Sequence, residues 1–248
     1  MLNFIRAEFF RAKKSILIKV FIVAGIIIPA LLLVSMEAAV THYIKTEEGF
    51  SFLASISSLI MVGANLTSLV IIFIGKSNDY YRLLLSQGLS KLQIVVYDFV
   101  FYQLLVLALG LFTAFVCLGL NAYINYSCGV PLFKGVAIFF ALFFYFYHVQ
   151  IAINSLTYLL YYVFKSPALA YLGHYILYAL LAGFITNLQK TLPDFLIKVL
   201  GLIFPLFSFF GKSLSTNQVL DLKIIPWLII WPLLSIFLSY RIFARREV

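Results

Sequence analysis

Two short segments carry the residue types of a phosphate-binding loop, but neither has its spacing. Gly75-Lys76-Ser77 and Gly211-Lys212-Ser213 each place a lysine and a hydroxyl directly after a glycine. A phosphate-binding loop needs another glycine five residues earlier, where this chain has Val70 and Leu206. We therefore expect no nucleotide or other cofactor site in the chain itself. Work driven by ATP would require a separate ATPase subunit.

The histidines and cysteines do not form a recognisable catalytic or metal-binding set. His148 follows Phe144 at the F-x-x-x-H spacing of intramembrane prenyl-protein endopeptidases, but Phe52 stands where their companion E-E-x-x-x-R needs arginine after Glu47-Glu48. There is no H-E-x-x-H motif, and the two cysteines indicate neither a disulfide framework nor a metal site. The chain is therefore not expected to be an enzyme by itself.

Several polar side chains fall inside strongly apolar stretches of the sequence. A polar group at membrane depth is a functional candidate, although amides more often hold helices together. No carboxylate stands out near the middle of these stretches, which disfavours a proton- or ion-coupled transporter. The residues that form a candidate substrate path are Asn65, Gln103, His148, Gln150 and Asn154.

The composition of the chain assigns it to the membrane proteins. Of its 248 residues, 64% are hydrophobic and 11% are charged, whereas soluble domains have about 45–50% and 25%. A helix needs about 20 apolar residues to cross a bilayer. We therefore expect an all-α membrane protein with six transmembrane helices, forming a single domain over residues 1–248. The predicted spans are about Ile16–Ala39, Phe52–Gly75, Gln93–Leu120, Gly135–Phe164, Ala168–Asn187 and Ile225–Phe243.

The distribution of positive charge predicts the orientation of the chain. With six spans both termini lie on one side, and twelve of the 18 lysines and arginines fall on that side, against six on the other. Cytoplasmic loops carry the excess of positive charge, so both termini are predicted to be cytoplasmic. The net charge of +9 therefore reflects topology. No nucleic acid is expected as a partner, because these cations flank apolar spans.

Residues 188–224 connect the last two predicted spans and contain a further apolar stretch. Pro193, Gly201 and Pro205 interrupt it, and a seventh full span would place the C-terminal arginines outside the cytoplasm. We therefore expect a re-entrant element that enters the membrane from the outer face, with irregular backbone shielded by protein or lining a cavity. An ordinary interfacial helix in the outer loop is the alternative.

Residues 1–15 are predicted to form an amphipathic helix. Leu2, Ile5, Phe9, Ala12 and Ile16 follow the spacing of one helical stripe, and the basic residues lie largely off it. Such a helix lies in the membrane interface, with its cations near anionic headgroups. A plain cytoplasmic extension of the first span fits the periodicity equally well.

The cytoplasmic loop over residues 76–92 is the most distinctive polar segment. Ser77, Asn78 or Asp79 are candidates to cap a short helix there, and Gly88 is a candidate to end it. Aromatic and leucine side chains rimmed by charge are typical of a docking surface. Packing against the protein's own helices is the alternative. The predicted docking residues are Asp79, Tyr80, Tyr81, Arg82, Leu83, Leu84, Leu85, Ser86, Gln87 and Gly88.

This pattern resembles the permease subunits of type-two ATP-binding-cassette exporters. These have an amphipathic elbow helix, six spans with cytoplasmic termini, a coupling helix between spans two and three, and a re-entrant element before span six. Met1–Arg11 is similar to the family's elbow, and Asp79–Ser90 is similar to its coupling segment. Tyr97-Asp98 stands where members often carry a lysine, so no role is carried to that site. The compact length is similar to the bacterial subgroup that handles lantibiotics, bacitracin and other amphipathic peptides.

The resemblance implies a permease subunit of an ATP-driven exporter in the bacterial cytoplasmic membrane. Its implied partners are two ATP-binding-cassette ATPase subunits, which would bind the ATP and Mg, a second permease, membrane lipids and an amphipathic or lipophilic substrate. The substrate would be a peptide, in export or self-immunity. The alternative is a non-pumping membrane sensor or binding protein for a peptide or lipid, which would need no ATPase contact.

Overall fold

The structure, a computed structural model, describes residues 2–35, 63–73, 76, 78–127, 129, 131, 135–188, 193, 195–196 and 225–245. In this part of the chain it contains eight helices and no strand, which confirms the predicted all-α class there. One of the eight comprises Gly63–Phe73, and we call it helix 63–73. The numbered helices are α1 (Leu2–Lys14), α2 (Ile16–Ser35), α5 (Asn78–Ser86), α6 (Lys91–Ser127), α7 (Val136–Phe164), α8 (Pro167–Leu188) and α11 (Ile225–Ala244).

One of the described helices is long and apolar enough to cross a membrane by length and composition. It is the Lys91–Tyr123 part of α6, which corresponds to the third predicted span. A second candidate is the pair Phe4–Lys14 and Ile16–Leu31, which meets the same criteria only if the bent pair is counted as one broken span. The other four predicted spans remain predictions. The predicted re-entrant segment 188–224 lies outside the described residues, apart from positions 188, 193, 195 and 196.

The N-terminal helix is a separate element rather than a straight extension of α2. The two helices are bent by 67° at Ser15. The Ser15 amide donates to the Ala12 carbonyl at 2.9 Å, and its hydroxyl accepts from the Leu17 amide at 3.3 Å. Serine is favoured at such a junction because its hydroxyl satisfies an amide that the new helix leaves unpaired.

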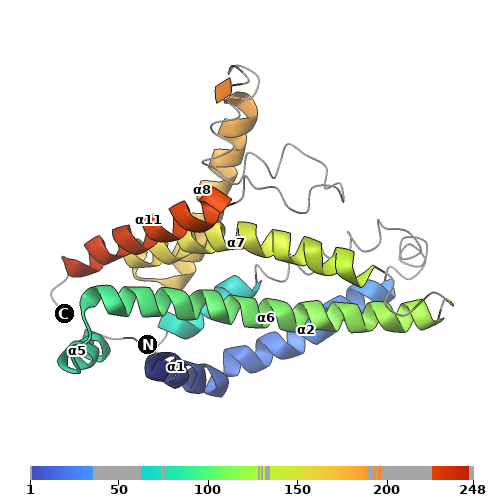
Figure 1. The fold of residues 1–248 in the computed structure, drawn as a ribbon, viewed down its shortest axis with the longest axis horizontal. Helices are drawn as coiled ribbons and strands as arrows, with labels where there is room; N and C mark the ends of the chain where they lie inside the picture. The colour runs from blue at the N-terminus through green and yellow to red at the C-terminus, as the bar shows by residue number, and fades with distance from the viewer. Residues whose placement is uncertain are drawn as a thin grey trace.

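The long helices form layers around α6 (Figure 1). α6 packs against α2 on one side and against α7 and α11 on the other, and α8 packs against α7. Both α1 and the last turn of α11 lie at the same end of the molecule as α5 (Figure 1). This end therefore brings together the N-terminal helix, the predicted docking loop and the C-terminal helix.

The core near this end is built from aromatic rings. Phe73 stacks on Tyr161 with the ring centroids 3.4 Å apart, and Phe243 of α11 lies near Tyr162. Tyr158 is fully buried and donates its hydroxyl hydrogen to the Val95 carbonyl at 2.8 Å. The hydrogen bond satisfies the polar end of a ring that is otherwise surrounded by apolar groups. These rings join helix 63–73, α6, α7 and α11.

Candidate functional site: the loop helix and the buried charges beneath it

The loop helix α5 begins at Asn78 and ends where the sequence predicts. Gly88 has a φ of 86°, which glycine adopts without strain. Its amide donates to the Leu85 carbonyl at 3.0 Å, and the Leu89 amide donates to the Leu84 carbonyl at 3.2 Å. These two bonds form a Schellman motif, which satisfies carbonyls that the helix end leaves free.

The chain enters α6 two residues after this motif through a capping box. The Ser90 hydroxyl accepts from the Gln93 amide at 3.2 Å, and the Gln93 side chain accepts from the Ser90 amide at 2.8 Å. Such reciprocal bonds fix the start of a helix. α5 is therefore joined to α6 by a short connection with defined backbone geometry.

One face of α5 packs against the protein itself. Tyr81 and Leu84 are both 7% exposed and belong to the core. The Tyr81 ring lies 5.0 Å from that of Phe243 in α11, measured between centroids. Burial raises the pKa of the Tyr81 hydroxyl. For these residues the structure therefore shows the alternative that the sequence left open, which is packing on the protein's own helices.

The opposite face of α5 is exposed. Leu83 is 55% exposed, and the exposed Arg82 and Asp79 beside it form an ion pair at 3.7 Å. Ser86, Gln87 and Gly88 are exposed as well, whereas Tyr80 and Leu85 are half-buried. The predicted docking residues therefore divide into an inner face that packs on the protein and an outer face that is exposed.

Three charged side chains are buried beneath α5. The Lys76 side chain has no exposed surface, and its ammonium lies 2.5 Å from the Asp98 carboxylate and 3.8 Å from that of Glu8. Glu8 also accepts from the Tyr80 hydroxyl at 2.7 Å and forms an ion pair with Arg11. This arrangement connects α1, α5, α6 and the segment after helix 63–73. We call the three buried residues Glu8, Lys76 and Asp98, together with the partly exposed Arg11, the buried charge cluster.

Arg11 and Tyr80 complete the attachment of α1. The Arg11 guanidinium donates to the Ile72 carbonyl at 2.8 Å, at the end of helix 63–73. Burial raises the pKa of the Tyr80 hydroxyl, and its hydrogen bond to Glu8 raises that pKa further. Tyr80 therefore stays protonated and acts as a donor to the carboxylate.

Sequence reasoning missed this cluster. It assigned no role to Asp98, which is completely buried. It considered Lys76 only in a phosphate-binding-loop candidate with the wrong spacing and as the start of the cytoplasmic loop. One signal was present in the sequence: Glu8 stands three residues after Ile5 and four before Ala12, within the apolar stripe of the first helix. A carboxylate on a buried face requires a partner.

The amides of the predicted substrate path bond mainly to one another. The Gln150 side chain donates to Asn154 at 2.9 Å, and Asn154 donates to Gln103 of α6 at 3.2 Å. Asn65 lies apart from them and accepts a hydrogen bond from the Tyr102 hydroxyl. The side chain of His148 lies outside the described residues. The three connected amides thus form a hydrogen-bonded link between α6 and α7.

No protein-family model matches the chain, and a search of curated proteins finds no similar sequence. Within the described residues, no group of three or more histidine, cysteine, aspartate or glutamate side chains is placed to hold a metal ion. The function must therefore be inferred from the residues and their geometry.

Proposed function

We propose that this chain is the transmembrane permease subunit of an ATP-driven exporter, moving an amphipathic or lipophilic substrate out of the membrane or cytoplasm. The observation that carries the proposal is the two-sided character of α5. Tyr81 and Leu84 hold the helix on the core, while Leu83 and the Arg82–Asp79 pair point outward. A helix that is fixed on one side and exposed on the other is suited to receive a partner and to transmit its movement.

The connections of α5 supply the route for that movement. The short connection through Gly88 and Ser90 leads directly into α6, whose 37 residues extend about 55 Å at 1.5 Å per residue. The Tyr80–Glu8 hydrogen bond and the buried charge cluster attach the same helix to α1. A displacement of α5 therefore shifts α1 and α6 together, because buried ionic contacts do not stretch without a large free-energy cost.

The complete transporter, on this proposal, has the organisation that the resemblance implies. This chain contributes six spans with cytoplasmic termini, an N-terminal elbow helix and a re-entrant element before the last span. Two permeases form the pathway in the bacterial cytoplasmic membrane. Two ATPase subunits hold ATP and Mg, and each accepts one α5 in a groove. ATP biases the permease pair between two conformations through these contacts.

An amphipathic or lipophilic substrate fits the polar groups that the described spans offer. Gln103, Gln150 and Asn154 bond to one another, and the Gln103 side-chain nitrogen has no hydrogen-bond partner in the described structure. A hydrophilic solute would therefore find few free partners there. Unpaired polar groups cost several kcal/mol each in an apolar environment. A membrane-active peptide avoids this cost because its apolar face stays in contact with the bilayer.

The proposal is tested by photo-crosslinking from α5. The photoreactive amino acid benzoylphenylalanine replaces Leu83, or Leu169 of α8 as a control of similar exposure (55% and 51%). The chain is co-expressed with the ATPase encoded beside its gene. We expect a crosslink from position 83 and none from position 169. An absence of any ATPase gene beside it, or equal crosslinking from both positions, would contradict the proposal.

Transport is tested with the purified complex in nanodiscs. ATP hydrolysis is measured with amphipathic peptides, lipids and soluble sugars. We expect peptides to stimulate hydrolysis and sugars to have no effect. Stimulation by sugars alone would reject the substrate class. A chain that binds the peptides without any ATPase contact would instead be the non-pumping sensor or binding protein.

A further inference from the structure

The C-terminal helix α11 carries an exposed stripe that changes from apolar to basic along its length. Ile230, Leu234 and Phe237 are 51%, 43% and 51% exposed, and Arg241 and Arg245 continue the same line at the helix end. The spacing of four, three, four and four residues places all five on one helical face. The stripe is therefore a continuous surface with an apolar part and a cationic end.

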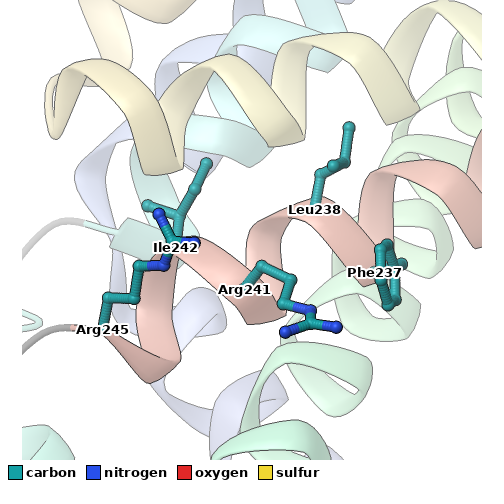
Figure 2. Close-up of a pocket in the computed structure, with 5 residues that line it drawn as sticks. All are labelled: Phe237, Leu238, Arg241, Ile242 and Arg245. Carbon is teal, nitrogen blue, oxygen red and sulfur yellow. The ribbon is translucent and has the colours of Figure 1, made fainter.

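A pocket of about 710 Å³ lies at the cationic end of this stripe. Among the described residues, those that line it belong to the last turns of α11 and the residue after it: Phe237, Leu238, Arg241, Ile242 and Arg245 (Figure 2). The Arg241 guanidinium lies 5.2 Å from the centre of the Phe237 ring, and Figure 2 shows the Arg245 side chain lying beside Ile242. Two guanidinium groups thus border an apolar hollow.

The charge of this pocket is not neutralised within the described residues. The four ion pairs found in that part of the chain involve Arg11, Lys76 and Arg82, and neither Arg241 nor Arg245 takes part in one. α11 itself contains no acidic residue. Guanidinium groups match phosphate oxygens in a bidentate geometry. The complementary ligand is therefore an anion that bears apolar chains.

The dimensions of the stripe match one leaflet of a bilayer. Eleven residues separate Ile230 from Arg241, which corresponds to about 16 Å along a helix. Half of the hydrocarbon core measures about 15 Å. A lipid whose acyl chain lies along Ile230, Leu234 and Phe237 would therefore place its phosphate at the two arginines.

We infer that this face of α11 is a binding site for an anionic phospholipid of the cytoplasmic leaflet, with Arg241 and Arg245 on the phosphate and Ile230, Leu234 and Phe237 along the acyl chain. The inference rests on the membrane placement of α11 in the proposed function, but not on the ATPase or the substrate. It assigns the two arginines a specific ligand in addition to their contribution to topology.

The chain contains its own reporter for this site. It has two tryptophans, Trp227 and Trp231, and both belong to α11. The full-length protein is reconstituted in vesicles of phosphatidylcholine, with either brominated phosphatidylglycerol or brominated phosphatidylcholine as a minor component. Bromine on the acyl chains quenches nearby tryptophan. The relative quenching by the two lipids then measures headgroup preference at α11 alone.

For the wild-type protein we expect about tenfold preference for phosphatidylglycerol, since each cation near an anionic surface contributes substantially to binding. Arg241→Gln/Arg245→Gln should abolish the preference, and Arg241→Gln alone should reduce it about threefold. The single variant keeps a positive helix end and so preserves insertion. Arg6→Gln/Lys165→Gln is the matched control, because it removes two exposed cations from α1 and from the C-terminal end of α7. It should keep the wild-type value.

Each other outcome overturns the inference in a defined way. Equal quenching by the two lipids in the wild type rejects a headgroup site. An unchanged lipid preference in Arg241→Gln/Arg245→Gln rejects the two arginines as ligands. If Arg6→Gln/Lys165→Gln loses the preference equally, the preference comes from the overall positive charge of the protein and not from a site on α11. If quenching of the tryptophans by both lipids decreases as the protein concentration rises, a second copy of the chain covers this face instead. Absence of quenching by either lipid rejects the membrane placement of α11, which separates that failure from a failure of ATPase docking.

Discussion

The Lys76 ammonium lies between two carboxylates, 2.5 Å from Asp98 and 3.8 Å from Glu8, and none of the three side chains is more than 4% exposed. Taking these charges out of water costs several kcal/mol for each ion, and their mutual attraction must offset that cost. Arg11 pairs with Glu8 at 2.5 Å, so Lys76 is the close cation of Asp98 and a more distant second cation for Glu8. The junction between α1, α5 and α6 therefore depends on Lys76 chiefly through Asp98.

Loss of the lysine should therefore destabilise the protein more than loss of Asp98. Lys76→Met leaves Asp98 buried without its cation, while Glu8 keeps its ion pair with Arg11, and we expect the change to lower the free energy of unfolding by about 3–5 kcal/mol. Asp98→Asn leaves Lys76 paired with Glu8 and should cost less. Both values are measured by denaturant titration in mixed micelles.

The exposed pair on α5 provides the control for this comparison. Asp79 and Arg82 have exposed side chains, 88% and 63% accessible, so water and salt screen their interaction. Arg82→Gln should therefore change the free energy of unfolding by less than about 1 kcal/mol. Equal losses for Lys76→Met and Arg82→Gln would show that burial of the cluster has no energetic importance.

Alkaline pH should weaken the attachment of α5. Burial, together with the hydrogen bond to Glu8, raises the pKa of Tyr80 above its ordinary value of 10.0, and burial does the same for Tyr81. Above pH 10.0 the unfolded chain therefore loses these protons while the folded chain keeps them. Stability contributed by the two hydroxyls is present below that pH and is lost as the pH rises.

The measurement is the free energy of unfolding as a function of pH. The wild type should lose stability more steeply above about pH 10 than Tyr80→Phe/Tyr81→Phe does. Tyr123→Phe, which removes a hydroxyl from a side chain that is 70% exposed, should behave as the wild type. An unchanged slope in the double variant would contradict the role of Tyr80 as a buried donor.

The two faces of α5 should respond differently to substitution. Leu84→Ala removes a buried side chain and should cost about 2–5 kcal/mol of stability. Leu83→Glu changes an exposed residue and should leave stability within about 0.5 kcal/mol. In the complex, however, Leu83→Glu should uncouple ATP hydrolysis from transport or release the ATPase. Full transport by Leu83→Glu would show that the exposed face of α5 does not contact the ATPase.

The amide link between α6 and α7 should be structural. Asn154→Leu removes the partner of both Gln103 and Gln150 and should cost about 0.6–2 kcal/mol of stability, with little change in substrate-stimulated ATP hydrolysis per folded complex. Asn121→Leu is the matched control, since this buried amide in α6 has an oxygen without a hydrogen-bond partner in the described structure. A change of substrate preference in Asn154→Leu would instead support the prediction that these amides line the substrate path.

The outer segment should enter the membrane without crossing it. Single cysteines at Asn187 and Lys223, placed in a background without Cys128, should both react with an impermeant thiol reagent added from outside. Cys117 is buried. A cysteine in place of the exposed Arg82 serves as the cytoplasmic control and should react only after permeabilisation. Labelling at only one of positions 187 and 223 would indicate a seventh span.

The sequence predicted those features that depend on local patterns. The glycine at position 88 ends α5 because its backbone conformation excludes most other residues. The apolar composition of α6 predicted a span-length helix over Gln93–Leu120. The observed helix is longer and runs from Lys91 to Ser127. Polar residues at the ends of a span can continue the helix, so hydropathy alone does not mark where the helix stops. The stripe of residues 2–16 predicted a helix, but it fitted a separate element and an extension of the first span equally well, and the 67° bend decides for the separate element.

The buried charges could not be located in the same way. Lys76 and Asp98 are 22 residues apart, and Glu8 and Tyr80 are 72 residues apart, so no local period relates them. Tyr81 and Leu84 show the same limit, because an aromatic-leucine helix has the same composition whether a face packs inward or outward. Only the position of α11, with Phe243 against Tyr81, decides between the two.

The attachment of α1 also imposes an order on biosynthesis. Glu8 leaves the ribosome 72 residues before Tyr80, which is about 4–14 s of synthesis at ordinary rates. For most of that interval the carboxylate on the apolar stripe has neither Lys76 nor Tyr80 to receive it, and only its neighbour Arg11 can pair with it. The nascent N-terminal helix therefore reaches its final contacts only after α5 has been made. The first helix to be synthesised is thus not the first to reach its final place.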